Sequence, residues 1–259
     1  MRNILKRLNK NILKSSPYLP KVVYPDDVYL VSYPKSGNTW VRFLLANALN
    51  EDQELEIDFH NIQEIIPEVI RNNDFIDKAK RPRLIKSHGL NVSYPRVIYI
   101  IRDGRDVYTS YYYYRQNKLP QGTSFTDFLK SEKHYPSLWS DHVNFWLNQS
   151  KKSDFLLVRY ENLIMNPKEQ LCRMLNFVGI ELSESNIDRA IQLSSFENMR
   201  HVESEKGRPY KKLEDVNQFL RKGEIGNWKQ LFKDEDKKIF NKKEGNALIQ
   251  SGYTADLNW

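Results

Sequence analysis

A lysine, a glycine and several hydroxyl and amide side chains stand together in residues 32–40, which read Ser-Tyr-Pro-Lys-Ser-Gly-Asn-Thr-Trp. The segment follows a short apolar run and precedes a helical pattern. At such a junction, backbone amides and the positive end of the helix converge on an anion. We expect this segment to bind a phosphate group, because Lys35 supplies a positive charge, Gly37 permits close backbone approach, and Ser36 and Thr39 add hydroxyl donors; Asn38 and Trp40 belong to the same predicted site.

A second group of polar residues stands at the end of another apolar run, in Leu-Ile-Lys-Ser-His at residues 84–88. If the run is a strand, it delivers Lys86 and His88 to the open edge of a sheet, where α/β proteins bind ligands. A lone histidine in such a place is more often structural than catalytic. The role of His88 therefore depends on what surrounds it.

The elements that must position these side chains alternate along the chain. Apolar, β-branched runs predict strands at residues 28–31, 83–86, 96–101 and 155–158, and helical periodicity predicts helices at 40–49, 140–149, 167–178 and 234–249. Asp103 can cap a further helix. Alternating strands and helices predict an α/β fold: a single domain with a mostly parallel central sheet flanked by helices. We expect an N-terminal extension at 1–25, the domain at 26–259, and a mobile loop acting as a lid at about 197–220.

Composition favours one globular domain that attracts anions. Apolar residues make up 40% of the 259 residues, and Lys and Arg outnumber Asp and Glu by 40 to 33, a formal charge of +7. The single cysteine, Cys172, excludes an internal disulfide and a multi-cysteine metal site, and it favours a reducing compartment, the cytoplasm. Residues 1–14 mix basic and apolar residues at helical spacing, which suits either weak contact with an anionic membrane or a solvated helix packed on the domain.

Three blocks of this sequence together resemble the sulfotransferases that use 3′-phosphoadenosine-5′-phosphosulfate (PAPS). Residues 33–40 are similar to the family's 5′-phosphosulfate loop. Residues 101–112, which begin Ile-Arg-Asp-Gly-Arg-Asp, resemble a block that binds the 3′-phosphate. Residues 221–229, Arg-Lys-Gly-Glu-Ile-Gly-Asn-Trp-Lys, are similar to the family's Arg-Lys-Gly-x-x-Gly-Asp-Trp-Lys. The resemblance runs from about residue 26 to residue 253.

This resemblance implies transfer of a sulfonate group from PAPS to a hydroxyl or amine acceptor, leaving 3′-phosphoadenosine-5′-phosphate (PAP), by in-line displacement and without a metal. His88 matches the family's catalytic base, and imidazole has suitable basicity for removing a hydroxyl proton near neutral pH. Lys35 is our choice for stabilising charge on the leaving phosphate, with Lys86 assisting. Ser36 is expected to hold Lys35 away from the donor until the acceptor arrives.

The same resemblance implies residues for the two ends of the nucleotide. The 3′-phosphate is assigned to Arg102, Ser110, Arg221, Lys222 and Gly223. The adenine is assigned to Trp40, Tyr160, Ser194 and Phe196. Asn38 and Asn227 stand where the family usually has Thr and Asp, changes that keep hydrogen-bonding capacity.

The acceptor and the oligomeric state stay open at this point, because small-molecule, glycan and lipid acceptors all fit. The four tyrosines at 111–114 cannot all face one way on a helix, so we expect two in the core and two at the surface or the acceptor pocket. One alternative function is a P-loop nucleotide kinase or hydrolase, which would need Mg²⁺. Another is a non-enzymatic module that binds nucleic acid, a partner we do not expect.

Overall fold

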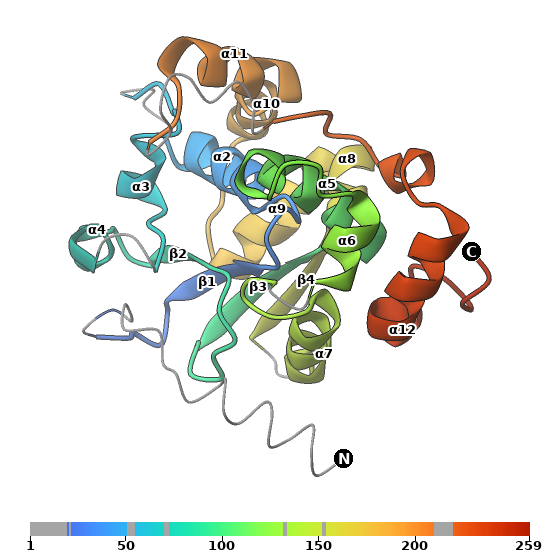
Figure 1. Cartoon of the computed structure of the whole chain (residues 1–259). Coiled ribbons are helices and arrows are strands. Elements are labelled where there is room, and N and C mark those ends of the chain that lie inside the picture. Colours follow the sequence, from blue (N-terminus) through green and yellow to red (C-terminus); the bar gives the residue numbers. More distant parts are fainter. Residues whose placement is uncertain are drawn as a thin grey trace.

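Four parallel strands form the sheet at the centre of the structure (Figure 1). They are β1 (Val28–Ser32), β2 (Leu84–Ser87), β3 (Arg96–Ile101) and β4 (Phe155–Arg159), in the order β2-β1-β3-β4. The computed structural model describes residues 20, 22–50, 55–69, 73–131, 134–151, 154–209 and 220–259. All four predicted strands are present, and the parallel arrangement confirms the predicted fold class.

Helices connect and cover these strands (Figure 1). Their bounds are α2 (Asn38–Leu49), α3 (Ile62–Ile65), α4 (Asn73–Lys78), α5 (Gly104–Arg115), α6 (Phe125–Lys130), α7 (Trp139–Gln149), α8 (Tyr160–Met165), α9 (Pro167–Val178), α10 (Glu184–Leu193), α11 (Phe196–Lys206) and α12 (Asp234–Gln250). Helix α9 has the predicted bounds, because Pro167 begins it and Gly179 ends it in a left-handed conformation. The predicted cap of α5 is confirmed, since the Asp103 side chain accepts a hydrogen bond from the Arg105 amide.

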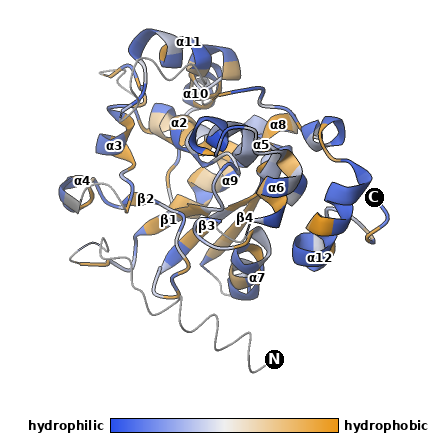
Figure 2. Cartoon of the chain, viewed as in Figure 1, coloured by the Kyte–Doolittle hydropathy of each residue, from blue (hydrophilic) through white to orange (hydrophobic). Residues whose placement is uncertain are grey.

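A separate apolar core lies on each face of the sheet. In β1, Val28 and Leu30 pack on one side with α2, α9 and α10, and Tyr29 and Val31 pack on the other with α5, α7 and α12. Figure 2 shows hydrophobic residues gathered in the strands and hydrophilic ones on the outer surfaces of the helices. Burial on both faces explains why the strands are nearly continuous apolar runs. Packing on both faces also holds the strands in place, so the loops that follow their carboxyl ends start from fixed positions.

Residues 197–220 do not form the single loop that the sequence predicts. Helix α11 occupies Phe196–Lys206, with the Ser195 side chain accepting from the Asn198 amide at its start. Its buried face contains only Met199, Val202 and Glu203, too few apolar residues to show a helical period in the sequence. Residues 210–219 lie outside the described part of the chain, so a lid there stays a prediction.

Residues 1–14, for which weak membrane contact is one of the two interpretations, also lie outside the described residues. In the part of the chain that the structure describes, no helix is both long and apolar enough to cross a membrane.

Candidate active site

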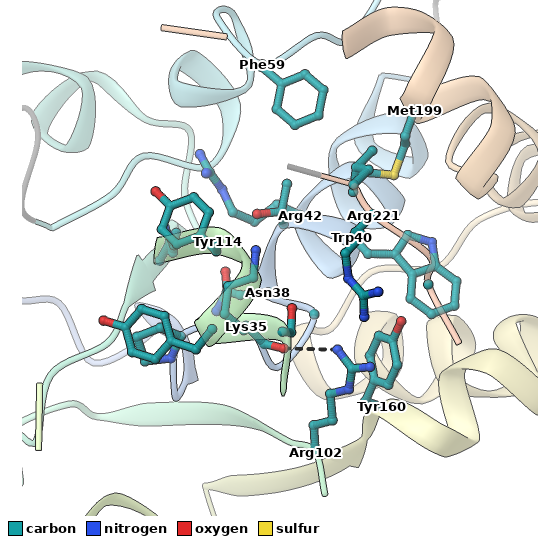
Figure 3. Close-up of a pocket in the computed structure, with 18 of the residues that line it drawn as sticks. Lys35, Asn38, Trp40, Arg42, Phe59, Arg102, Tyr114, Tyr160, Met199 and Arg221 are labelled. Carbon is teal, nitrogen blue, oxygen red and sulfur yellow. Dashed lines mark hydrogen bonds between the residues drawn. The ribbon is translucent and has the colours of Figure 1, made fainter. Parts of the chain in front are cut away.

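The carboxyl ends of all four strands contribute to one cavity of about 480 Å³ (Figure 3). Lys35 follows β1, Lys86 and His88 end β2, Arg102 follows β3, and Tyr160 follows β4. The edge where the strands end is the usual ligand site of open parallel sheets. Every predicted site residue lines this cavity except Ser36 and Ser194: Lys35, Gly37, Asn38, Thr39, Trp40, Lys86, His88, Arg102, Ser110, Tyr160, Phe196, Arg221, Lys222 and Gly223.

The loop between β1 and α2 takes a conformation that its glycine makes accessible. Lys35 and Gly37 both have positive φ, 70° and 93°. A Cβ atom on Gly37 would lie 2.5 Å from Cδ2 of Tyr160, closer than side chains approach. The Asn38 side chain donates to the Leu30 carbonyl at 3.0 Å and to the Ser32 hydroxyl at 3.2 Å. The start of α2 is thereby tied to β1, and Asn38 supports the loop as well as lining the cavity.

Lys35 extends into the cavity, and its Nζ lies 4.5 Å from the centroid of the Tyr114 ring. Burial, together with the positive charges of Arg208 and Arg102, lowers the pKa of Lys35 to about 7. The predicted hold of Ser36 on Lys35 is not seen, because the Ser36 side chain is buried beneath the loop. Tyr114, and not Ser36, is the side chain beneath the ammonium group.

His88 is oriented by a backbone hydrogen bond from β1. Its Nδ1 lies 2.6 Å from the Ser32 carbonyl oxygen, which can only accept, so Nδ1 carries the proton in the neutral ring. The lone pair is then on Nε2. Burial, and secondly the charge of Lys86, lowers the pKa of His88 to about 3. In the protein alone, the ring is therefore neutral at physiological pH and able to accept a proton.

Arg102 connects the three blocks that the sequence singled out. Its guanidinium donates to the Lys35 carbonyl at 3.2 Å and to the Glu224 carbonyl at 2.9 Å, and it lies over the Tyr160 ring at 4.2 Å. A single carboxylate, Asp106 of α5, accepts from two amides of the third block, Gly226 at 2.7 Å and Trp228 at 3.0 Å. Residues far apart in the sequence are thus held against one cavity.

Aromatic side chains form one end of the cavity. The rings of Trp40 and Tyr160 meet edge to face, with centroids 5.9 Å apart. A Cβ atom on Gly223 would lie 2.7 Å from Phe196, so only glycine fits there beside that ring. Arg221 and Arg102 lie on the same side as Trp40 and Tyr160 (Figure 3).

Ser194 supports this end indirectly, which corrects its assignment as a direct contact. It is fully buried and does not line the cavity. Its hydroxyl accepts from the Asn47 side chain at 3.0 Å, and its carbonyl accepts from Trp40 Nε1 at 2.9 Å. A sequence match cannot show which way a serine side chain points, whereas the structure shows that Ser194 holds Trp40.

The cavity is also lined by residues that the motifs did not indicate. Arg42, Phe59, Glu68, Tyr135 and Met199 are the main ones, and Arg42 and Glu68 are close enough to His88 to act on its charge. Glu68 Oε1 lies 2.8 Å from Lys86 Nζ, and both side chains are largely buried. These residues come from loops and helices without fixed spacing, so no local pattern indicated them. Tyr114 is different, because it lies one helical turn after Ser110 and belongs to the tyrosine run expected to reach the pocket.

No cluster of three or more His, Cys, Asp or Glu side chains suited to a metal ion occurs within the described residues.

Comparisons with known proteins match most of this chain. A family model described as a sulfotransferase domain matches residues 25–252. The chain is 30% identical over 235 residues to sulfotransferase 1E1 of Bos taurus, covering 80% of this chain and 78% of that protein. It is 31% identical over 242 residues to sulfotransferase 2A1 of Rattus norvegicus, covering 85% and 84%.

Solved structures show the same fold. Retinol dehydratase in a complex with retinol and PAP has a TM-score of 0.70 and 21% identity, covering 95% of this chain and 86% of that one. Mouse sulfotransferase SULT7A1 complexed with PAP has a TM-score of 0.64 and 23% identity, covering 89% and 88%.

Proposed function

The chain belongs to the sulfotransferase domain family, and from that premise we propose how its cavity performs the family's reaction. The protein is a PAPS-dependent sulfotransferase, and PAP is the product that its donor leaves. The kinase and the nucleic-acid module are not favoured by these comparisons. The catalytic and binding roles that we give to individual side chains are our proposal.

One observation carries the proposal: both predicted anion sites open into one cavity. The loop of Lys35 and Thr39 is at one site, and Arg102, Ser110 and Arg221 are at the other. A nucleotide with a 5′-phosphosulfate and a 3′-phosphate needs two such sites, with donors at each. Trp40 and Phe196 offer aromatic faces for the adenine, and Tyr160 offers a hydroxyl. The residues present therefore fit PAPS.

His88 serves as the general base in this proposal. Its Nδ1 is engaged by the Ser32 carbonyl, which leaves Nε2 to accept the proton of the acceptor. A pKa of about 3 makes the free protein's imidazole a weak base. A bound anion raises the pKa of a nearby imidazole, so donor binding strengthens the base when it is needed.

Lys35 stabilises the leaving group in this proposal. The donor supplies the sulfonate, and negative charge grows on the phosphate oxygen that it leaves. The Lys35 side chain lines the same cavity as the rest of the 5′-phosphosulfate loop. Lys86, predicted as a second cation for this step, is paired with Glu68. We therefore assign Lys86 to the acceptor side of the reaction.

Calorimetry with PAP and ADP tests the proposal. PAP should bind at least about 100-fold more tightly than ADP, because only PAP places a charge against Arg102 and Arg221. Addition of EDTA should change neither PAP binding nor transfer from labelled PAPS. Equal affinity for the two nucleotides, or loss of activity in EDTA, would contradict the proposal and favour the P-loop alternative. The predicted cytoplasmic location is not tested by any of these observations and stays a prediction.

A further inference from the structure

Three charged side chains of the cavity, Arg42, Glu68 and Lys86, act on His88, whereas the pocket for a simple phenol or steroid needs mainly apolar walls. We call the part of the cavity that contains them the acceptor end and define it by Arg42, Phe59, Glu68, Lys86, Tyr114 and Tyr135. Arg42 and Tyr114 lie across the cavity from Trp40 and Tyr160 (Figure 3). The acceptor end is thus distinct from the end assigned to the adenine.

The ion pair at the acceptor end is built into the fold. Glu68 is 7% exposed, and its carboxylate contacts Lys86 Nζ at 2.8 Å. Backbone hydrogen bonds fix both residues: the Lys86 amide donates to the Pro67 carbonyl at 2.8 Å, and the Val69 amide donates to the Lys86 carbonyl at 3.0 Å. The Glu68 amide also donates to the Gln63 side chain. The segment around Glu68 is therefore attached to the edge of β2, directly before His88.

A paired carboxylate and ammonium match a particular kind of ligand. A hydroxyl both donates and accepts, so neighbouring hydroxyls satisfy the carboxylate and the ammonium together without adding net charge. Burying the pair under an apolar ring would remove its remaining hydration and return no hydrogen bonds. The tyrosines Tyr114 and Tyr135 add hydroxyls and flat ring faces to the same end.

We infer that the acceptor is a hydroxyl-rich molecule of the sugar class, held by the Glu68–Lys86 pair so that one hydroxyl faces His88; this inference rests on the proposed function. In the reaction, a sulfur–oxygen bond forms to that hydroxyl as the sulfur–oxygen bond to the 5′-phosphate breaks. The hydroxyl proton passes to His88, and the bonding electrons leave with PAP. Glu68 is a specificity-determining residue in this scheme.

An acceptor panel with ³⁵S-labelled PAPS and the unmodified protein is the decisive test. Methyl glycosides and disaccharides should give kcat/KM at least about 10-fold above 2-naphthol and a 3-hydroxysteroid, since a site built for hydroxyls rejects ligands that lack them. Preference for 2-naphthol or the steroid, or no turnover of any sugar, would overturn the inference. Calorimetry with PAP on the same sample separates the two claims: intact PAP binding leaves the proposed function standing, and its loss removes both.

Substitutions at Glu68 test whether this residue determines the preference for sugars. Glu68→Gln should lower kcat/KM for the best sugar by about 10-fold or more, mainly by raising KM, and leave the Kd for PAP within about 2-fold. Glu64→Gln is the matched control, because Glu64 is exposed on α3 and does not line the cavity. Unchanged sugar kinetics in Glu68→Gln would overturn the role of the pair. If this variant does not bind PAP, Glu68→Asp replaces it, and the panel on the unmodified protein decides the acceptor class in any case.

Discussion

The two ends of the cavity are built in different ways. At the nucleotide end, Arg102 donates to backbone carbonyls in the loop of residues 33–40 and in the block of residues 221–229. Asp106 accepts hydrogen bonds from two backbone amides of the latter block. At the acceptor end, side chains from separate loops meet around His88, with Glu68 and Lys86 as the fixed pair. The nucleotide end is a network of short motifs, and the acceptor end is an assembly of single residues.

This difference indicates which part of the protein is free to change. A nucleotide site whose side chains also hold the backbone of neighbouring motifs loses several contacts when one residue changes. An acceptor site built from single side chains can exchange one of them while the rest stay in place. Four experiments test whether the two ends contribute separately to turnover and to PAP binding.

The largest effect is expected at the acceptor end, for His88→Ala. Turnover should fall by about 1,000-fold, because the acceptor proton loses its base, while the Kd for PAP changes by less than about 3-fold. Turnover of labelled PAPS and calorimetry measure the two quantities. His201→Ala, which removes an exposed histidine of α11, is the control. A parallel loss of PAP binding would show that His88 belongs to the nucleotide end instead.

Gly37→Ala should damage the nucleotide end. The new methyl group would meet Tyr160 at 2.5 Å, and a φ of 93° is strained for alanine. We expect PAP affinity to fall by about 100-fold, since strain of a few kcal/mol must be relieved by shifting the loop or Tyr160. Gly122→Ala has a similar φ of 81° but no atom within 4 Å, so it should leave PAP binding unchanged. Equal effects of the two variants would mean that backbone strain, not contact with Tyr160, is responsible.

Arg102→Ala should weaken PAP binding by about 30-fold and affect AMP much less, because we assign the lost charge to the 3′-phosphate. The ratio of the two dissociation constants, measured by calorimetry, reports the loss. Arg173→Ala, an exposed arginine of α9 outside the cavity, should leave that ratio unchanged. If AMP and PAP weakened equally, Arg102 would act only by supporting the loop at Lys35.

The smallest effect is a proton taken up on nucleotide binding. Lys35 has a pKa lowered to about 7, so most molecules carry a neutral Lys35 at pH 8, and a bound anion raises that pKa. PAP binding at pH 8, where the phosphates of the nucleotide are already fully ionised, should therefore take up most of one proton. Calorimetry in buffers of different ionisation enthalpy measures the uptake. Lys35→Met should abolish it; uptake that persists in this variant would assign the proton to another group.

The nucleotide end could be predicted from the sequence because its information is local. Residues 33–40 and 221–229 carry their ligands within a few positions, and the strands beside them are short apolar runs. Strand β3 and helix α9 even have the predicted bounds, set by an apolar run and by Pro167 with Gly179. Backbone conformation that is determined by residues close in the sequence can be predicted from the sequence.

At the acceptor end, Lys86 and His88 were predicted from the sequence, but the residues that surround them were not, because the contacts join distant positions. Glu68 reaches Lys86 across the edge of β2, and Tyr135 enters from a loop that has no motif. The direction of a side chain was equally hidden, as Ser36 and Ser194 show: both stand in recognisable segments, yet both are buried away from the cavity. Helix α11 was missed since its few apolar residues show no period.

The tie between Asp106 and the amides of Gly226 and Trp228 has a consequence for synthesis on the ribosome. The carboxylate is made about 120 residues before the amides that it accepts from, and until they emerge it lacks those partners. A growing chain that has already formed its sheet therefore still lacks one wall of its nucleotide site. The ability to bind PAP therefore arises only after residues 221–228 have been synthesised and have met Asp106.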